Sequence, residues 1–303
     1  MSLDFHLPTV HIARSRLTAV AAALLCTAAL AQAETVVGLT TTNALVSFDT
    51  ATPQNATVPV TITGLLGVNE TILGIDRRPA TGALYGLGSS GRLYILNTTT
   101  GAATFASLIS GAALTGTAYG IDFNPVPDRL RVTSTAGQNL RIDVTTGVAI
   151  ADTALNGPTT SLAGSAYINN VAGAASTMLY GISSATDSLY LQSPPNAGTL
   201  TLVGSLGFDT VAVSGFDISG TSGLAFASLT NADTAKSSFY RINLATGAAT
   251  LIGAFGIGGN PALAAPLLGI ALDVGVIPEP STYAMLFAGL LAVGSIVRRR
   301  RQA

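Results

Sequence analysis

The sequence predicts an all-β protein: a five-bladed β-propeller preceded by a signal helix and followed by a membrane helix. Three observations predict it. Only 10% of the 303 residues are charged and 33 are glycine, which suits short strands and tight turns better than long helices. A strand-and-turn motif recurs at nearly even spacing. The two ends of the repeat array hold complementary parts of one further unit.

The recurring motif is clearest in LRIDVTTG (140–147), where apolar residues alternate and a turn rich in Thr and Gly follows. This is the pattern of a strand that enters a hairpin. Each copy carries one Asp, Asn or Gln at the start of the turn, 46 to 51 residues from the next. These residues are Asp49, Asn97, Asp143, Gln192 and Asn243.

Three other strand patterns accompany each copy of the motif. The innermost pattern resembles GIDFN and occurs at 74–78, 120–124, 166–170, 215–219 and 269–273. The next occurs at 83–90, 129–135, 178–184 and 223–229. The last follows each hairpin, at 103–108, 148–153, 199–206 and 249–255. Four strands in every unit of about 50 residues are typical of a propeller blade.

The ends of the array predict how the ring closes. The last unit has only its first strand, 267–274, and three strands are left over at 35–42, 45–53 and 57–65. Joining them makes a fifth blade and removes exposed strand edges. A β-solenoid or two packed β-sandwiches are alternatives, but a solenoid usually has a shorter repeat and sandwiches leave the even spacing unexplained.

Residues 1–33 have the pattern of a secretory signal peptide. Arg14 and Arg16 precede a mostly apolar core at 17–30, and a small-x-small cleavage site follows. We therefore expect cleavage by signal peptidase and a propeller domain over 34–276; a permanent anchor is the alternative. The residues of the expected cleavage site are Ala31, Ala33 and Glu34.

The C-terminal segment 277–303 combines three elements. The tripeptide Pro278-Glu279-Pro280 precedes an apolar run, 284–297, which ends at four arginines, 298–301. Fourteen helical residues span about 21 Å, which is short of a bilayer's hydrocarbon core of about 30 Å, although snorkelling arginines extend the reach. The arginines favour a cytoplasmic C-terminus, which places the domain outside the inner membrane.

These elements, in this order, closely resemble the PEP-CTERM sorting signal of Gram-negative bacteria. The resemblance implies processing by an exosortase at or near Pro278, Glu279 and Pro280. It also implies transient residence in the inner membrane, followed by release to the cell surface or the exopolysaccharide matrix. A plain tail anchor is the alternative.

Composition excludes several kinds of chemistry. The only cysteine, Cys26, and both histidines, His6 and His11, lie in the predicted signal peptide, and the chain has no Trp. The mature protein therefore lacks the residues for disulfides, thiol catalysis, Cys/His zinc sites and Ser–His–Asp triads. From Glu34 to Val276 there are thirteen acidic residues against seven Arg and one Lys, so we expect no nucleic-acid partner.

The central unit, 120–147, resembles a secreted bacterial family of unknown function that often carries PEP-CTERM tails. The resemblance rests on Gly120–Pro125, Asp128–Val132 and Asn139–Arg141. It implies a propeller-like repeat with no established activity, so it supplies no catalytic residues.

Five residues of this unit are candidate ligand-binding groups: Asp122, Asp128, Arg129, Arg131 and Arg141. Asp122 and Asp128, with Asn124, offer hard oxygen ligands suited to calcium, but the EF-hand glycine and glutamate are missing. The structural interpretation is that Asp122 and its equivalents, Asp76 and Asp217, cap turns.

The arginines have two interpretations as well. Arg129, Arg131 and Arg141 would grip a carboxylate or an acidic sugar through paired hydrogen bonds. Alternatively, they form inter-strand ion pairs with Asp122, Asp128 and Asp143 on a solvated face, where such pairs contribute little. The second interpretation is favoured, and the arginines stay the best ligand candidates because the other units have fewer.

Together these observations predict an exported, non-enzymatic binding or structural module. No cofactor and no metal are expected, with calcium the one ion the residues suit. The alternative is a polysaccharide hydrolase or lyase whose acids lie at the propeller channel, where Asp76 and Asp122 would meet.

Overall fold

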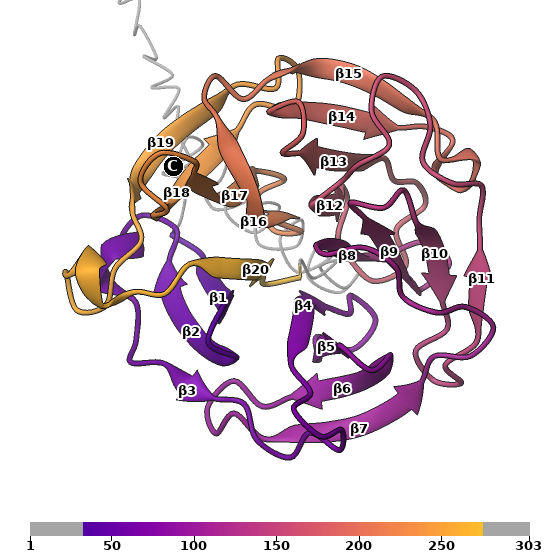
Figure 1. The fold of residues 1–303 in the computed structure, drawn as a ribbon, viewed down its shortest axis with the longest axis horizontal. Helices are drawn as coiled ribbons and strands as arrows, with labels where there is room; N and C mark the ends of the chain where they lie inside the picture. The colour runs from indigo at the N-terminus through magenta and orange to yellow at the C-terminus, as the bar shows by residue number, and fades with distance from the viewer. Residues whose placement is uncertain (1–32, 275–303) are drawn as a thin grey trace, which may run out of the picture. The chain divides into compact units, whose positions relative to one another are not determined.

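The computed structural model describes residues 33–274. Within them, twenty strands form five four-stranded antiparallel sheets, arranged as blades around a central axis (Figure 1). The predicted five-bladed propeller is confirmed. The predicted signal peptide up to Gln32 and the segment with Pro278, Glu279 and Pro280 lie outside the described residues.

Four blades are each built from consecutive strands, and in each the strand that comes first in the sequence lies nearest the axis (Figure 1). The first holds β4 (Ile72–Arg77), β5 (Leu84–Gly88), β6 (Arg92–Leu96) and β7 (Ala103–Leu108). The second holds β8 (Tyr119–Asn124), β9 (Arg129–Ser134), β10 (Asn139–Ile142) and β11 (Ala149–Ala151). The third holds β12 (Gly164–Tyr167), β13 (Leu179–Ser183), β14 (Ser188–Gln192) and β15 (Leu200–Ser205). The fourth holds β16 (Thr210–Ile218), β17 (Ala225–Asn231), β18 (Ser237–Ile242) and β19 (Ala249–Ala254).

The fifth blade joins the two ends of the array, as the sequence predicts. Its strands are β20 (Leu267–Leu272), β1 (Thr35–Thr40), β2 (Ala44–Asp49) and β3 (Val60–Thr61), in that order from the axis outward. β1 pairs antiparallel with β20, with Val36 opposite Leu272. Short 3-10 turns lie at Pro53–Asn55, Pro195–Ala197 and Pro261–Leu263.

The recurring motif works as a side-chain-capped turn. Asp143 Oδ1 accepts hydrogen bonds from the backbone N–H groups of Thr145 (2.9 Å) and Thr146 (3.2 Å). Asn97 and Asn243 do the same in their blades. Gly147 then adopts φ +80°, which a residue with a side chain rarely does. The repeated Asp or Asn is therefore explained by the turn.

The outer edges of the blades are tied to their neighbours. Isolated parallel bridges join Thr63 to Ala102, Ser110 to Val148, and Asn156 to Thr199. Each bridge links the segment between two blades to the outer part of the next blade. Bonding at these positions leaves less of the edge strands free to pair with another chain.

The apolar core lies between adjacent blades. For example, the ring centroids of Tyr85 and Phe123, from β5 and β8, are 5.3 Å apart. Phe48 of β2 similarly packs against Phe239 of β18 at 5.1 Å. Stacking of each sheet on the next thus buries both of its faces.

Each innermost strand carries a glycine where it approaches the next blade. A Cβ atom built on four of these five glycines would lie within 2.9 Å of the neighbouring inner strand. The distances are 2.5 Å for Gly74 to Ile121, 2.7 Å for Gly120 to Gly164, 2.9 Å for Gly164 to Phe216, and 2.5 Å for Gly215 to Ile270. For Gly269 the nearest atom, on Ile75, is 3.4 Å away. Glycine therefore lets the inner strands close tightly around the axis.

This ring corrects one predicted register. The sequence aligned 166–170 with 120–124, which would match Ala166 to Gly120. In the structure Gly164 occupies the glycine position, and Tyr167 takes the place of Phe123 in the bonding between blades. The alignment was wrong by two residues because this blade has Ala166 where two of its neighbours have aspartate.

Candidate functional site

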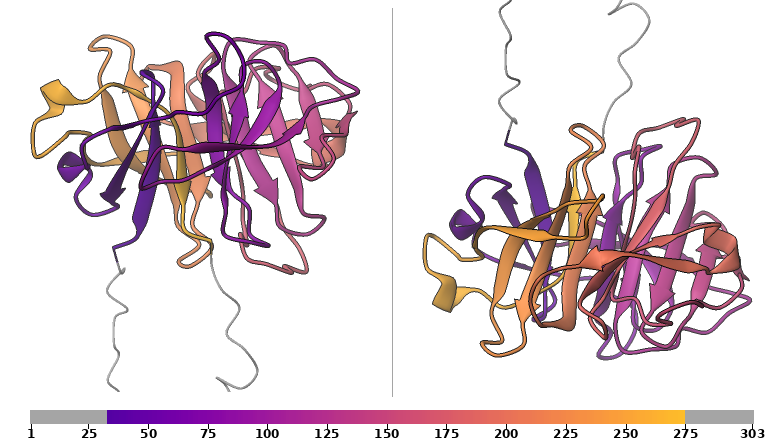
Figure 2. Two further views of the ribbon diagram at one scale, coloured as in Figure 1. Left: turned by 90° about the horizontal axis from the view of Figure 1, so that it is seen from below. Right: turned by 90° about the horizontal axis from the view of Figure 1, so that it is seen from above.

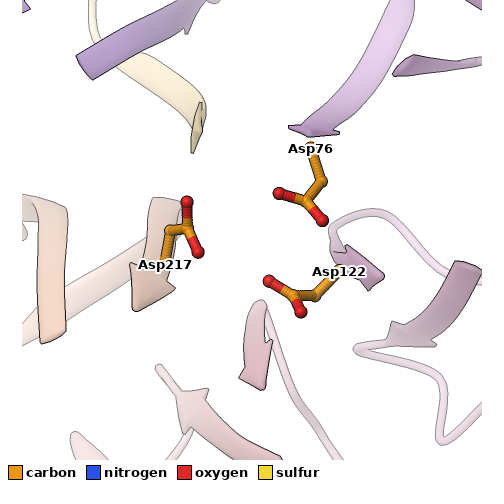
Figure 3. A group of neighbouring side chains, drawn as sticks. All are labelled: Asp76, Asp122 and Asp217. Carbon is orange, nitrogen blue, oxygen red and sulfur yellow. The ribbon is translucent and has the colours of Figure 1, made fainter. Parts of the chain in front are cut away.

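Three aspartates converge at the propeller axis. Asp76 of β4, Asp122 of β8 and Asp217 of β16 each stand two residues after a ring glycine, whereas the other two inner strands have Ala166 and Ala271 there. The three carboxyl groups turn toward a common centre (Figure 3), and one oxygen from each lies within 4.8 Å of the others. The side chains are buried, with each residue 0–1% exposed.

One oxygen of each carboxyl group connects its blade to the next. Asp76 Oδ2 accepts a hydrogen bond from Phe123 N (2.6 Å), Asp122 Oδ1 from Tyr167 N (3.0 Å), and Asp217 Oδ2 from Leu272 N (2.6 Å). The donors belong to the next inner strands, β8, β12 and β20. The predicted turn-capping role of these aspartates is therefore wrong: they lie within strands and bond across blades.

The remaining oxygens differ in their surroundings. Asp217 Oδ1 accepts from Ile218 N at 2.6 Å. Asp76 Oδ1 and Asp122 Oδ2 are buried and have no hydrogen-bond partner among the described residues. A buried carboxylate oxygen without a partner is costly, so this centre favours a proton or a cation.

Burial raises the pKa values of all three carboxyl groups. Burial, followed by the negative charge of Asp217, raises the pKa of Asp76 well above its usual range. Burial raises the pKa of Asp122 in the same way, and the charges of Asp76 and Asp217 add to it. Burial raises the pKa of Asp217 to about 7, although backbone N–H groups of Leu272 and Ile218 oppose the rise.

Few other charged groups lie near the cluster. Arg77 Nε lies 3.2 Å from Asp273 Oδ1, and Glu34 accepts a hydrogen bond from Ser219. Within residues 33–274, no basic side chain donates a hydrogen bond to Asp76, Asp122 or Asp217. The described chain begins and ends at one face of the propeller (Figure 2).

The axis itself is nearly filled. A cavity of about 10 Å³ lies among the inner-strand glycines, two residues along the strands from the aspartates; Ser165 and Ser214 also line it, and the three aspartates do not. This is about the space that one water molecule occupies. At the level of these glycines the axis therefore has no room for a sugar ring.

The arginine candidates lie elsewhere, and Arg131 is buried. It is 1% exposed, and its guanidinium donates to Asp152 Oδ2 (2.6 Å) and Asn139 Oδ1 (2.8 Å) through Nη1. Its Nη2 donates to Asn196 Oδ1 (2.7 Å) and its Nε to Tyr167 Oη (3.2 Å), both in the next blade. Arg131 therefore joins two blades, and its surroundings are not the solvated face that the ion-pair interpretation assumed.

Arg141 completes this network. Its Nε and Nη2 bond both oxygens of Asp152, at 2.7 and 2.8 Å, so Asp152 accepts from two arginines. Asp122 lies opposite Arg131 across the β8–β9 pair, yet the guanidinium pairs with Asp152. Arg131 and Arg141 therefore pair with Asp152, which the sequence analysis did not single out. The expected partners were Asp122, Asp128 and Asp143.

Asp128 and Arg129 lie in and after the β8–β9 turn. Asp128 has φ +52° and accepts paired hydrogen bonds from Arg78 Nε and Nη2 at 2.9 and 2.5 Å. Arg129 Nη2 lies 3.2 Å from Asp143 Oδ2, as expected for an exposed inter-strand pair. Asn124 Oδ1 accepts from Val126 N at 3.0 Å. Asp122, Asn124 and Asp128 thus have separate partners.

The structure brings Asp76 and Asp122 together at the axis, as the alternative interpretation of the sequence expected, and adds Asp217, which the sequence marked only as their equivalent. The signal that would have found the site is the Gly-x-Asp tripeptide in three of five inner strands. In a closed ring, equivalent inner-strand residues face one axis, so three copies of one acid must meet.

Comparisons with known proteins give the fold a context but no activity. The structures it resembles include a protein of unknown function from Bacteroides thetaiotaomicron, with 13% identity, a TM-score of 0.44, and 69% of this chain and 55% of that one covered. Another is titled Dos1 propeller, with 14% identity, a TM-score of 0.39, and coverage of 72% and 58%. This chain thus covers little more than half of either protein. No curated protein matches the sequence.

The described residues 33–274 contain no helix long and apolar enough to cross a membrane. Residues 276–301 match the PEP-CTERM protein-sorting motif, which confirms the predicted sorting signal. The motif indicates export in a Gram-negative bacterium and processing by exosortase from a membrane-anchored precursor. Residues 44–265 match the family described as Domain of unknown function (DUF4394), and the chain belongs to this family.

Proposed function

We propose that the exported propeller is a non-enzymatic binding or structural module of the cell surface or exopolysaccharide matrix. One observation carries the proposal: Asp76, Asp122 and Asp217, the acids that converge at the axis, are only 0–1% exposed. Signal peptidase would release the domain at Ala33–Glu34, and exosortase would then act near Pro278-Glu279-Pro280.

The alternative is a polysaccharide hydrolase or lyase with its acids at the channel. Glycoside hydrolysis needs two carboxyl groups that flank the scissile bond, roughly 5–10 Å apart. The three axial aspartates are each 0–1% exposed, and one carboxyl oxygen from each lies within 4.8 Å of the others. Carboxyl groups buried to this extent do not contact a sugar in solvent, so the observed arrangement favours the non-enzymatic role.

The first test is a turnover assay on the exported protein. We expect incubation with the host's exopolysaccharide to release no more reducing ends than the heat-denatured protein does. The Asp122→Asn variant should match the wild type, because Asp122 contacts no substrate. Release of sugar by the wild type that this variant abolishes, with its circular dichroism spectrum unchanged, would show that the protein is an enzyme.

The second test concerns sorting. The matrix-associated form is expected to end near Pro280 and to lack the arginines at 298–301, which intact-mass spectrometry measures directly. In a strain without exosortase, the cell-bound protein should keep them. Matrix-associated protein that retains all four arginines would exclude processing at this motif.

A further inference from the structure

We propose that Asp76, Asp122 and Asp217 bind one calcium ion at the propeller axis. The ion would connect β4, β8 and β16, inner strands of three different blades. This site differs from the calcium site that the sequence suggested, which would use Asp122, Asn124 and Asp128. The proposal does not depend on whether the module binds polysaccharide.

The oxygen positions suit calcium by size. Calcium binds carboxylate oxygens at about 2.3–2.6 Å, so two oxygens on one ion lie at most about 5.2 Å apart. The three carboxyl groups meet this limit, since one oxygen from each lies within 4.8 Å of the others. Magnesium demands near-ideal octahedral geometry and keeps several of its waters, so it is seldom held by a dedicated cage of protein oxygens. We therefore expect calcium to be preferred.

The unpartnered oxygens are a second, independent indication of a ligand. Asp76 Oδ1 and Asp122 Oδ2 are buried without any donor, while the other oxygen of each already accepts a backbone N–H from the next blade. The free oxygens are thus the ones left to face the common centre seen in Figure 3. Bonding between blades does not explain them.

An amide would serve the structural role equally well. Asparagine offers one carbonyl oxygen, which suffices to accept Phe123 N or Tyr167 N, and it carries no charge to bury. Two of the five inner strands have alanine at the same position, Ala166 and Ala271. At these two positions the inner strands need no carboxylate, so bonding between blades does not by itself explain why three carboxyl groups meet at one point.

The charges of the neighbourhood also suit a divalent cation. The only basic side chain whose charge acts on Asp76 and Asp217 is Arg77, as far as the described residues show. Its guanidinium donates to Gly82 O, and only its backbone N–H acts as a donor toward Asp76. Glu34 and Asp273 add negative charge on the same side of the propeller. One calcium ion offsets two of the three buried carboxylates, and water or backbone carbonyls supply the other ligands.

The test begins with the exported, processed protein as it is isolated from calcium-containing medium. Elemental analysis is expected to find one calcium per chain. Removal by EDTA should lower the melting temperature by roughly 5–10 °C, the shift for a ligand present at about 100 times its Kd in a domain of this size. Calcium should restore the stability, and magnesium should restore much less.

Variants then locate the ion. Asp122→Asn and Asp217→Asn keep the shape of the side chain and the acceptor for the next blade, and each should weaken calcium binding at least about 10-fold. Asp233→Asn removes the same charge from an exposed turn and should bind calcium like the wild type. Asp128→Asn tests the alternative site formed by Asp122, Asn124 and Asp128, and it should also leave calcium binding unchanged.

Two results would overturn the proposal. One is wild-type protein that contains no calcium and melts at the same temperature with EDTA or calcium. The other is a calcium Kd in both Asp122→Asn and Asp217→Asn that equals the wild-type Kd, which would place the ion elsewhere. The first measurement needs no variant, so a variant that fails to fold leaves the proposal testable. Neither result bears on the turnover assay.

Discussion

Replacing Asp152 by alanine is expected to lower the free energy of unfolding by about 3–5 kcal/mol, the range seen when a buried ion pair loses one partner. Asp152 is the anion for Arg131, and their side chains are 6% and 1% exposed. The substitution leaves the guanidinium of Arg131 in the interior with only neutral partners: Asn139, Asn196 and Tyr167. Urea denaturation, followed by circular dichroism, measures the change.

Two variants test whether the unpaired charge is the cause. Arg129→Ala removes a more exposed pair, with Asp143, and should cost less than about 1 kcal/mol. The double variant Asp152→Ala, Arg131→Met removes the buried charge together with its partner and should be more stable than Asp152→Ala alone. If Asp152→Ala cost no more than Arg129→Ala, Arg131 would be solvated in solution and the buried network would be wrong.

This network shows what the sequence alone does not supply. Arg131 was recognisable as a strand residue, because it stands between Leu130 and Val132 in an alternating pattern. Its burial depends on Asp152, 21 residues away, and on Asn196, 65 residues away in another blade. Nothing local marks these two residues as partners, so strand periodicity alone suggested a solvated face.

The architecture, in contrast, could be predicted because each blade repeats the same local chemistry. The turn at Asp143 follows from an Asp side chain that bonds its own backbone, and it recurs at Asn97 and Asn243. Closure of the ring follows from counting strands at the two ends. Such local and countable features survive sequence divergence between blades.

The axial site falls between these two cases. The equivalence of Asp76, Asp122 and Asp217 was readable from the sequence, and so was a meeting of Asp76 and Asp122 at the axis. Repetition of the aspartate in successive blades nevertheless favoured a role in turns. Their meeting depends on the closed ring, and their burial depends on how closely the inner strands approach. A residue that repeats in a propeller's inner strands should therefore be treated as one site.

That close approach leads to the second large effect. Gly215→Ala is expected to lower the free energy of unfolding by about 3 kcal/mol or more, at or above the upper end for overpacking. The added Cβ would lie 2.5 Å from Ile270 N, 2.7 Å from Gly269 C and 2.9 Å from Gly269 Cα. All three are backbone atoms of β20, so relief requires the fourth and fifth blades to separate. Urea denaturation of the exported chain measures the change.

Gly269→Ala is the matched control, because Gly269 holds the same position in the next inner strand. Its Cβ would meet Ile75 at 3.4 Å, an ordinary contact, so the cost of packing is small. Alanine also restricts the unfolded chain, which offsets about 0.4–1 kcal/mol. We expect Gly269→Ala to stay within about 1 kcal/mol of the wild type. If both substitutions lowered the free energy of unfolding equally, the glycines would be needed for the backbone conformation of the strands. Close contact with the next inner strand would then not be the reason.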